Sequence, residues 1–527
     1  MRSGIANAEN FVSVLSLRPS FVIFAANQQN MTAMKRTILF PLLLLLGLSG
    51  LRGQEVKETT DSLAVYFDLL VQDLLPAGTN VGICMYDLTV GRPLYEYQAD
   101  KLSRPASTMK LLTTITSLAQ PRADEPFRTE VWYQGTVKAD TLHGDLYVVG
   151  GFDPEFDEDA LDSLVRSVAR LPFSVIRGTV YGDVSMKDSL YWGSGWLWDD
   201  DPASFQPYLS PLMLCKGVVT VCTHPAERGM QALVKCRPES SYYRVQNNTR
   251  SRTPSAGRYR VTRNWMENGN EICVTGNVTS RTTNTLNLYS SQDFFMHTFV
   301  ERLQQHGLRC APTSWQGDTI PLLPPSQVYA FREFVRDSLS TRVARYETSA
   351  QRVVNEIMKE SDNLNAEALL CRLGTQFTGE KRVSARDGLS AVRRLIEQLG
   401  FDPKNYRLAD GCGLSHYDYI SPELLVAFLK YAYSNTDVFQ RLYKALPISG
   451  VDGTLKRRMG YGTPAFRKVR AKTGTYTGIS SLAGYLQTAD GHWVAFAIMN
   501  QNILSGRQAR AFQDALCTEL IQMQVGK

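Results

Sequence analysis

The 527-residue chain lacks a block of Lys and Arg residues, an internal repeat and a low-complexity tract. Its 57 basic and 51 acidic residues are scattered, so the net charge of +6 does not indicate a nucleic-acid partner. No apolar run after the first 53 residues reaches the roughly 20 residues that span a bilayer. With 43% hydrophobic and 10% aromatic residues, the composition favours a packed globular protein of two or three domains.

Histidine is scarce, and the arrangements that many hydrolases build around it are missing. None of the six histidines stands in a recognisable triad context, and no G-x-S-x-G segment surrounds a candidate serine. A serine nucleophile still needs a partner that takes its proton, and a desolvated lysine is another solution. The missing triad therefore directs attention to Ser–Lys pairs.

The cysteines do not form a recognisable framework. There are nine, they are widely spread, and the odd number leaves at least one thiol free or intermolecular. Cys222 and His224 are the closest approach to a metal motif, but a second pair at zinc spacing is missing. We expect no metal and no cofactor.

A secretory signal is the clearest feature near the N-terminus. From Met34 the chain reads MKRTILFPLLLLLGLSGLRGQE, in which two positive charges precede an apolar run and then small residues. Residues 34–53 are interpreted as a signal peptide that leaves Gln54 first after cleavage. Residues 1–33 do not fit such a signal and are either untranslated or an extended N-terminal region. No cysteine lies near the cleavage point, so lipid anchoring is not expected.

The remaining chain divides by its hydrophobic patterns. Residues 54–125 and 345–527 contain helical periodicity and paired apolar runs, including predicted hairpins at 80–98 and 480–502. Residues 126–344 contain many short β-type runs broken by Gly, Pro, Asn and Asp. These patterns predict one α/β domain assembled from both outer stretches, with residues 126–344 as a β-rich insertion of two subdomains.

The first candidate site is the stretch RPASTMKLLTT. Ser107 and Lys110 lie three residues apart at the start of a predicted helix, where their side chains share one face. About two Ser-x-x-Lys matches are expected by chance in a chain of this length, so the pattern alone is weak. A capping serine followed by a solvated lysine is the simpler interpretation of this stretch taken alone.

Two further motifs change that balance. Ser361–Asn363 reads Ser-Asp-Asn between two helical runs, where an N-cap is the alternative interpretation. Lys472–Thr475 reads Lys-Thr-Gly-Thr at the start of the C-terminal hairpin, where a protected edge strand is the alternative. Ser-x-x-Lys, Ser-Asp-Asn and Lys-Thr-Gly in this order are the signature of penicillin-binding proteins and class A β-lactamases.

With these motifs, the sequence resembles the exported D-alanyl-D-alanine carboxypeptidase/endopeptidases, the class C low-molecular-mass penicillin-binding proteins. The long stretch between Ser107 and Ser361 is typical of that group. Further segments that carry the resemblance are GDLYVVGGFDPEF, GWLWDDDPASFQPY, LADGCGLSHYDYISP and LPISGVDGTLKRR. The resemblance implies a β-lactamase-like serine transpeptidase domain of class α/β, with an antiparallel sheet flanked by helices and large β-rich inserted domains.

The resemblance also implies a mechanism. Ser107 is the expected nucleophile, and Lys110 is the base that accepts its proton. Ser361 is expected to pass a proton to the leaving amine with help from Lys472, and two nearby ammonium groups depress each other's pKa. The backbone N–H groups of Ser107 and Thr475 are the expected oxyanion hole.

Substrate-binding roles follow from the same resemblance. Asn363 is expected to hold the substrate amide and to contact Lys110. Lys472 and Thr473 are expected to bind the terminal carboxylate of the substrate. Gly474 is expected to let the strand and the substrate approach closely.

An acidic run in the insertion supplies a further candidate. In the family, an Asp and an aromatic residue of the WLWDDDPASF region line the pocket for the peptide side chain, and the tryptophan spacing places them on Asp200 and Phe205. A slip of one residue would select Asp199 or Asp201, and a solvated turn is the alternative interpretation. A carboxylate here suits the amino group of a diamino acid in the stem peptide.

Two segments depart from the family pattern. Cys412 stands where the family usually has Ser, which gives either a reactive thiol near the site or a small buried side chain. The segment LSPLMLCKG departs from an Asn-containing pattern. Neither change removes an expected catalytic group.

The predicted function is therefore that of a periplasmic serine peptidase, acylated by β-lactams, that cleaves D-Ala-D-Ala bonds in peptidoglycan stem peptides. A β-lactamase is one alternative, although the Glu that holds the deacylating water in class A enzymes is not identifiable here. A non-catalytic module that binds the cell wall or senses β-lactams is the other. The pattern does not separate carboxypeptidase from endopeptidase activity, and no nucleic-acid partner or stable membrane insertion is expected.

Overall fold

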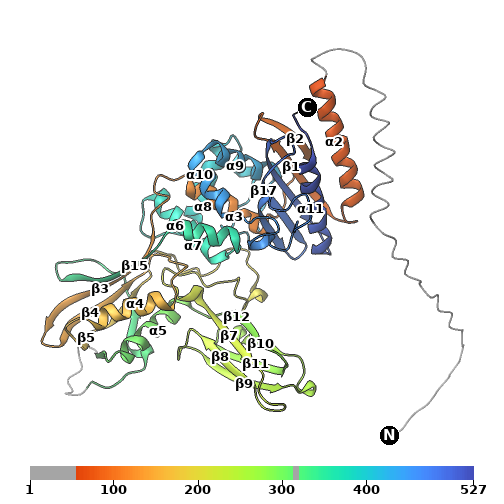
Figure 1. The fold of residues 1–527 in the computed structure, drawn as a ribbon. Helices are drawn as coiled ribbons and strands as arrows, with labels where there is room; N and C mark the ends of the chain where they lie inside the picture. The colour runs from red at the N-terminus through yellow and green to blue at the C-terminus, as the bar shows by residue number, and fades with distance from the viewer. Residues whose placement is uncertain (1–54, 312–319, 527) are drawn as a thin grey trace, which may run out of the picture. The chain divides into compact units, whose positions relative to one another are not determined.

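Strands from both ends of the described chain pair in one antiparallel sheet, with the order β16-β17-β18-β1-β2 (Figure 1). The strands are β1 (Asn80–Asp87), β2 (Arg92–Tyr97), β16 (Arg470–Tyr476), β17 (Ile479–Gln487) and β18 (Trp493–Gln501). β1 pairs with β18 in a register that places Ile83 opposite Ile498. Both predicted hairpins are confirmed, because β1 pairs with β2 and β17 with β18.

The computed structural model describes residues 55–311 and 320–526. The predicted signal peptide, residues 34–53, and the segment before it lie outside the described residues. Within the described part, no helix has both the length and the apolar character needed to cross a membrane. All nine cysteines are described, and each is a free thiol.

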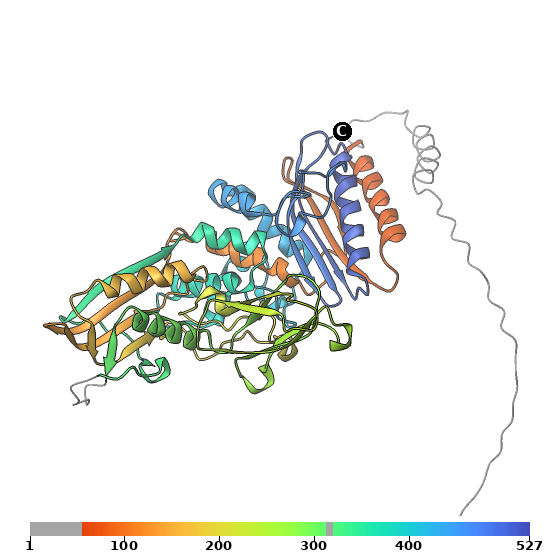
Figure 2. The same ribbon diagram turned by 60° about the horizontal axis from the view of Figure 1, so that its bottom comes forward.

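Two helices cover one face of the five-stranded sheet, α2 (Glu55–Leu74) and α11 (Gly506–Gln522) (Figure 2). Phe67 of α2 and Leu516 of α11 are fully buried with apolar side chains of the strands. Val71 of α2 is buried as well, whereas Leu74 at the end of the helix is exposed.

The other face of the sheet packs against a group of helices. They are α3 (Met109–Leu118), α6 (Ala350–Lys359), α7 (Asn363–Thr378), α8 (Ala385–Gln398), α9 (Pro422–Ser434) and α10 (Thr436–Ala445). Every residue of α3 is buried. A helix buried all round belongs at the centre of a core, where each fully buried Leu or Ile contributes about 1.5–3 kcal/mol. The stretch that carries Ser107 and Lys110 is therefore held rigidly.

The insertion forms three further sheets with a core of their own. A seven-stranded sheet contains β3 (Phe127–Lys138), β4 (Thr141–Val149), β5 (Val175–Arg177), β6 (Val180–Asp183), β13 (Arg309–Ala311), β14 (Tyr329–Phe331) and β15 (Ser340–Thr348). Two three-stranded sheets contain β7 (Val218–His224), β8 (Leu233–Arg237), β9 (Arg244–Ser251), β10 (Arg260–Arg263), β11 (Glu271–Val278) and β12 (Thr282–Asn287). The helices α4 (Glu158–Ala169) and α5 (Ser291–Gln305) belong to the same region.

The predicted fold class, an antiparallel sheet flanked by helices with a large β-rich insertion, is confirmed by this arrangement. The predicted domain boundaries at residues 125/126 and 344/345 stay a prediction, because residues 60–527 cluster as one compact unit.

Candidate active site

Ser107 and Lys110 meet at the entry to α3. Ser107 lies in a 3-10 turn, Ala106–Thr108, that leads directly into the helix, and the N-cap positions of the turn and of the helix are Pro105 and Thr108 rather than Ser107. Lys110 Nζ lies 2.9 Å from Ser107 Oγ. The contact expected from the spacing is thus present, and the alternative of a solvated lysine is wrong, because Lys110 is fully buried.

The surroundings of Lys110 suit a neutral amine. Its Nζ donates to Asn363 Oδ1 at 2.6 Å and to the Cys412 carbonyl at 2.7 Å. Burial lowers the pKa of Lys110, although the nearby carboxylates of Asp410 and Glu367 act in the opposite direction. A neutral amine has two N–H groups and one lone pair. Asn363 and Cys412 use the two N–H groups, which leaves the lone pair for the Ser107 hydroxyl proton.

A second serine–lysine pair joins the edge strand β16, which carries Lys472, to Ser361 in the turn between α6 and α7. Lys472 Nζ donates to Ser361 Oγ at 2.7 Å and to the Thr473 carbonyl at 2.8 Å. Burial, followed by the positive charge of Lys110, lowers the pKa of Lys472 far below its ordinary value. Ser361 has a left-handed backbone with φ of 62°, a conformation that the surrounding fold must enforce.

The strand β16 passes very close to the turn that carries Ser107. A Cβ atom added at Gly474 would lie 2.6 Å from the Pro105 carbonyl oxygen and 3.2 Å from Ser107 N. Gly474 was expected to let the strand and the substrate approach each other closely. In the structure, the part of the protein that lies closest to Gly474 is the turn Pro105–Ser107. This contact brings the backbone of Gly474 and Thr475 beside the Ser107 N–H.

A cavity of about 500 Å³ opens over these groups. It is lined by Ser107, Ser361, Thr454, Arg457, Arg458, Thr473, Thr475 and Arg510. Arg458 is held by Asp514 at 2.6 Å, whereas Arg457 is exposed. The arginines were not predicted as site residues. Arg457 and Arg458 lie in LPISGVDGTLKRR, a segment that carries the family resemblance, whereas Arg510 lies outside it.

The three aspartates of the acidic run have different surroundings. Asp200 Oδ2 accepts a hydrogen bond from the Tyr476 hydroxyl at 2.5 Å, at the end of β16. Asp201 is buried and pairs with the buried Arg263 at 2.7 Å. Asp199 is exposed. Of the three, only Asp200 both contacts the active-site strand and remains partly accessible.

The insertion also contacts the Ser-Asp-Asn motif. Asn363 Nδ2 donates to the Phe205 carbonyl at 2.7 Å, and the Phe205 side chain is 48% exposed. Lys216 Nζ lies 2.7 Å from Asp362 Oδ2 and 2.9 Å from Glu155 Oε1. Lys216 and Glu155 were not predicted as site residues, although LSPLMLCKG and GDLYVVGGFDPEF, which contain them, stood out in the sequence.

The loop that holds the Cys412 carbonyl is braced by two buried carboxylates. Asp410 accepts the N–H groups of Gly413 and Ser415 at 2.6 and 2.7 Å, and Glu367 accepts the Gly411 N–H at 2.8 Å. These residues were not predicted as site residues, although Asp410 lies in LADGCGLSHYDYISP, a segment that carries the family resemblance. Their bonds fix the carbonyl that receives Lys110.

Cys412 itself is fully buried, and burial raises the pKa of its thiol well above the ordinary value. The interpretation as a small buried side chain therefore holds. Within the described residues, potential ligand atoms of Glu367, Asp410 and Cys412 lie within 4.8 Å of one another. Both carboxylates already accept backbone N–H groups, which is the arrangement of a braced loop.

Comparison with known proteins agrees with this geometry. A family model for the D-Ala-D-Ala carboxypeptidase 3 (S13) family matches residues 64–320 and 339–522. A D-alanyl-D-alanine carboxypeptidase of Actinomadura sp. (strain R39) is 29% identical over 497 residues, which cover 90% of this chain and 86% of the relative.

Two solved structures of penicillin-binding protein 4 (dacB) from Haemophilus influenzae share the fold. The first has a TM-score of 0.73 at 22% identity and covers 86% of this chain and 99% of its own. The second, complexed with a novel β-lactam, has a TM-score of 0.67 at 20% identity, with the same coverage. Because the family model spans most of the described residues, the chain belongs to the D-Ala-D-Ala carboxypeptidase 3 (S13) family and is a serine peptidase.

Proposed function

We propose that this protein cleaves the D-Ala-D-Ala bond of peptidoglycan stem peptides through an acyl-enzyme on Ser107, and that β-lactams acylate the same serine. The observation that carries the proposal is the 2.9 Å contact between Ser107 Oγ and the fully buried Lys110 Nζ. Burial keeps the lysine in the neutral form that accepts a proton.

In the first step, Ser107 Oγ attacks the carbonyl carbon and its proton passes to Lys110 Nζ. The carbonyl oxygen becomes an oxyanion that accepts hydrogen bonds from the Ser107 and Thr475 N–H groups. The close packing at Gly474 supports this pairing, because it brings β16 to the Ser107 backbone. Loss of one such donor typically costs about 2.7–4 kcal/mol of transition-state stabilisation.

In the second step, the C–N bond breaks and the leaving amine takes a proton from Ser361 Oγ. Ser361 recovers a proton from Lys472, whose Nζ lies 2.7 Å away. Water then attacks the acyl carbonyl carbon and gives a proton to Lys472, which lost one in the previous step, while Lys110 returns its proton to Ser107 Oγ as the acyl C–O bond breaks and the acid product leaves. Lys110 returns to its neutral form at the end of the cycle.

The substrate carboxylate binds beside β16, where Thr473 lines the cavity and the buried Lys472 lies next to Ser361, which also lines it. Approach of a carboxylate favours the charged form of Lys472 and offsets the cost of its burial. Arg457 and Arg510 line the same cavity and add positive charge that attracts the anionic end of the peptide.

Asp200 binds the amino group of a diamino acid in the stem peptide, and the exposed Phe205 ring contacts its aliphatic part. The Asp200–Tyr476 hydrogen bond supports this role, because it holds the carboxylate at the end of the strand that carries Lys472. The signal-like residues 34–53 support export to the periplasm, where cross-linked peptidoglycan is the substrate.

Labelling with a fluorescent penicillin, followed by mass spectrometry of the modified peptide, tests the proposal. The adduct is expected on Ser107 and is expected to disappear in Ser107→Ala, while the control Ser163→Ala, at an exposed position of α4, keeps it. Persistent acylation of a folded Ser107→Ala protein contradicts the nucleophile assignment.

Products from purified sacculi then identify the reaction. Release of D-Ala from pentapeptides indicates carboxypeptidase activity, and cleavage of cross-linked dimers indicates endopeptidase activity. Acylation without either product favours a β-lactam-sensing module. Steady hydrolysis of nitrocefin favours a β-lactamase.

A further inference from the structure

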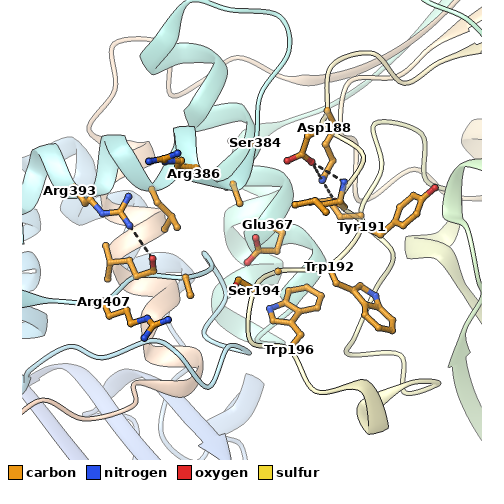
Figure 3. A pocket seen from close by; sticks show the side chains of 18 residues that line it. Asp188, Tyr191, Trp192, Ser194, Trp196, Glu367, Ser384, Arg386, Arg393 and Arg407 are labelled. Atoms are coloured by element: carbon orange, nitrogen blue, oxygen red, sulfur yellow. Dashed lines mark hydrogen bonds and ion pairs between the residues drawn. The ribbon is translucent and has the colours of Figure 1, made fainter. Parts of the chain in front are cut away.

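A second pocket, of about 470 Å³, lies apart from the catalytic cavity (Figure 3). One side is formed by residues 187–196 of the insertion, and the other by α8 and residues 407–409. It shares no lining residue with the cavity over Ser107. Its volume falls in the range of pockets that bind small molecules.

One wall of this pocket carries three guanidinium groups, those of Arg386, Arg393 and Arg407 (Figure 3). In the part of the chain that the structure describes, none of the ion pairs to a carboxylate involves these three arginines. Burial, followed by the positive charge of Arg386, lowers the pKa of Arg393. Like charges gathered without a carboxylate are unfavourable, and an anionic ligand would relieve that repulsion.

Two of the arginines are held in place. Arg393 Nη2 donates to the Leu408 carbonyl at 3.1 Å, and the Arg407 guanidinium stacks over the Tyr417 ring at 4.8 Å. Both contacts are made to neutral groups, so the positive charges of Arg393 and Arg407 are not neutralised and can bind an anionic ligand. Arg386 is exposed at the first turn of α8.

The two acidic side chains that line the pocket do not neutralise the arginines. Asp188 pairs with Lys187 at 2.6 Å. Glu367 is only 2% exposed and accepts the Gly411 N–H, and burial together with Asp410 raises the pKa of its carboxyl. The pocket therefore keeps an excess of positive charge on the arginine side.

The opposite wall is aromatic, with Tyr191, Trp192 and Trp196 (Figure 3). Trp192 is supported by the Tyr208 ring at 5.0 Å, and Trp196 Nε1 donates to Asp410 Oδ2 at 2.8 Å. Both indoles are thus fixed by other parts of the protein. A fixed indole offers a large apolar surface, against which the C–H face of a sugar ring packs well.

We propose that this pocket binds a sugar that carries an anionic substituent. The carboxylate or phosphate of the ligand lies against Arg386, Arg393 and Arg407, where charge-assisted and bidentate hydrogen bonds form. The ring lies toward Trp192 and Trp196. The site is distinct from the groups that act on the D-Ala-D-Ala bond.

Isothermal titration calorimetry of the mature chain with four probes tests the proposal. Two probes are anionic sugars: N-acetylmuramic acid carries a carboxylate, and N-acetylglucosamine 6-phosphate carries a phosphate. The other two are controls: N-acetylglucosamine has the sugar ring without the anion, and inorganic phosphate has the anion without the sugar ring. We expect at least one anionic sugar to bind with saturation, at least tenfold more tightly than the neutral sugar or phosphate. Equal binding of the neutral sugar, equal binding of phosphate, or no saturable binding of either anionic sugar overturns the proposal.

Variants then locate the binding. Arg386→Gln and Arg407→Gln each remove one exposed guanidinium and are expected to weaken the anionic sugar about tenfold or more, because hydrogen bonds to charged groups are the strong ones. Arg394→Gln is the matched control, since Arg394 lies on the same helix but pairs with Glu397 at 2.9 Å. Melting temperatures establish that the variants are folded. Unchanged binding in both pocket variants, or an equal loss in Arg394→Gln, overturns the assignment to this pocket.

Discussion

Lys216 Nζ lies 2.7 Å from Asp362 Oδ2, so a lysine of the insertion binds the central residue of the Ser-Asp-Asn motif. Asp362 also caps α7 by accepting the Asn365 N–H at 2.9 Å. Its two neighbours in the chain contact the two buried lysines of the site. Lys216 has a left-handed backbone with φ of 63°, which indicates that tertiary contacts enforce its position.

Lys216→Met is expected to slow penicillin acylation at least tenfold, because Asp362 loses the partner that fixes Ser361 and Asn363. It should also lower the free energy of unfolding by about 1–3 kcal/mol, since Glu155 and Asp362 lose a shared, partly buried cation. Stopped-flow acylation and urea unfolding measure the two effects.

The matched control is Lys381→Met. Lys381 also lies between two carboxylates, at 3.2 Å from Asp183 and 2.9 Å from Glu333, but it does not contact the motif. A loss of stability without a change in acylation is expected for this control. The same pattern in Lys216→Met would show that Lys216 does not position the site.

The three motifs were readable from the sequence because their chemistry is local. Ser107 and Lys110 share a helix face, and residues 472–475 form one strand. The supports of the site were not readable in this way. Lys216 reaches Asp362, and Asp201 reaches Arg263, across long stretches of chain. Only the folded arrangement shows which member of an acidic run is already paired, and no periodicity carries that information.

The fold, like the site, was predictable from the sequence where its pattern is local and not where it depends on contacts between distant residues. Paired apolar runs joined by turn residues predicted both hairpins, and β17 and β18 are indeed buried along nearly their whole length. The Asp410–Ser415 loop has no such pattern. Its conformation depends on Asp410 and Glu367, whose hydrogen bonds to backbone N–H groups become visible only when the loop is folded.

Gly474→Ala is expected to reduce the acylation rate about 100-fold while the protein stays folded. The new methyl group would lie 2.6 Å from the Pro105 carbonyl, so β16 must move away from the Ser107 N–H and the oxyanion donors separate. Gly460→Ala is the control, because a Cβ there meets no atom within 4 Å. Normal acylation by Gly474→Ala would contradict the proposed oxyanion site.

The pH dependence of acylation should report Lys110. Burial lowers its pKa from the ordinary 10.5, and only the neutral amine accepts the Ser107 proton. The acylation rate is therefore expected to rise with pH through this lowered pKa and to reach a plateau below pH 10.5. Rates of β-lactam acylation across the pH range measure it.

Lys110→Arg tests the same point, because a guanidinium does not lose its proton in this range. The rising limb should vanish, and the rate should fall about 100-fold or more. Circular dichroism checks the fold of this variant. A rate in wild type that stays constant between pH 5 and 10 would contradict Lys110 as the base.

Asp200→Asn is expected to reduce the preference for stem peptides with a diamino acid about tenfold in kcat/KM, since the ammonium group of the peptide loses its charged partner. Activity on a peptide with a neutral residue at that position should change little. Asp199→Asn is the control, because Asp199 is exposed and adjacent. An equal loss on both peptides would instead indicate that Asp200 supports the site through Tyr476, to which it is hydrogen-bonded.

Binding of a D-Ala carboxylate should be accompanied by uptake of a proton. In the free protein, burial and the nearby Lys110 lower the pKa of Lys472, so its neutral form is favoured. A bound carboxylate favours the charged form and raises that pKa. Titration of Ser107→Ala with an acetylated D-Ala-D-Ala peptide at pH 8, in buffers of different ionisation enthalpy, measures the number of protons taken up.

The peptide amide is the matched probe, because it lacks the carboxylate and should bind more weakly without proton uptake. The uptake should also decrease at lower pH, where Lys472 is already protonated before the ligand arrives. Equal proton uptake with the acid and the amide would assign the proton to another group. Binding of the acid with no uptake at any pH would mean that Lys472 carries its charge in the free site, and that electrostatic attraction by a preformed ammonium selects the substrate carboxylate.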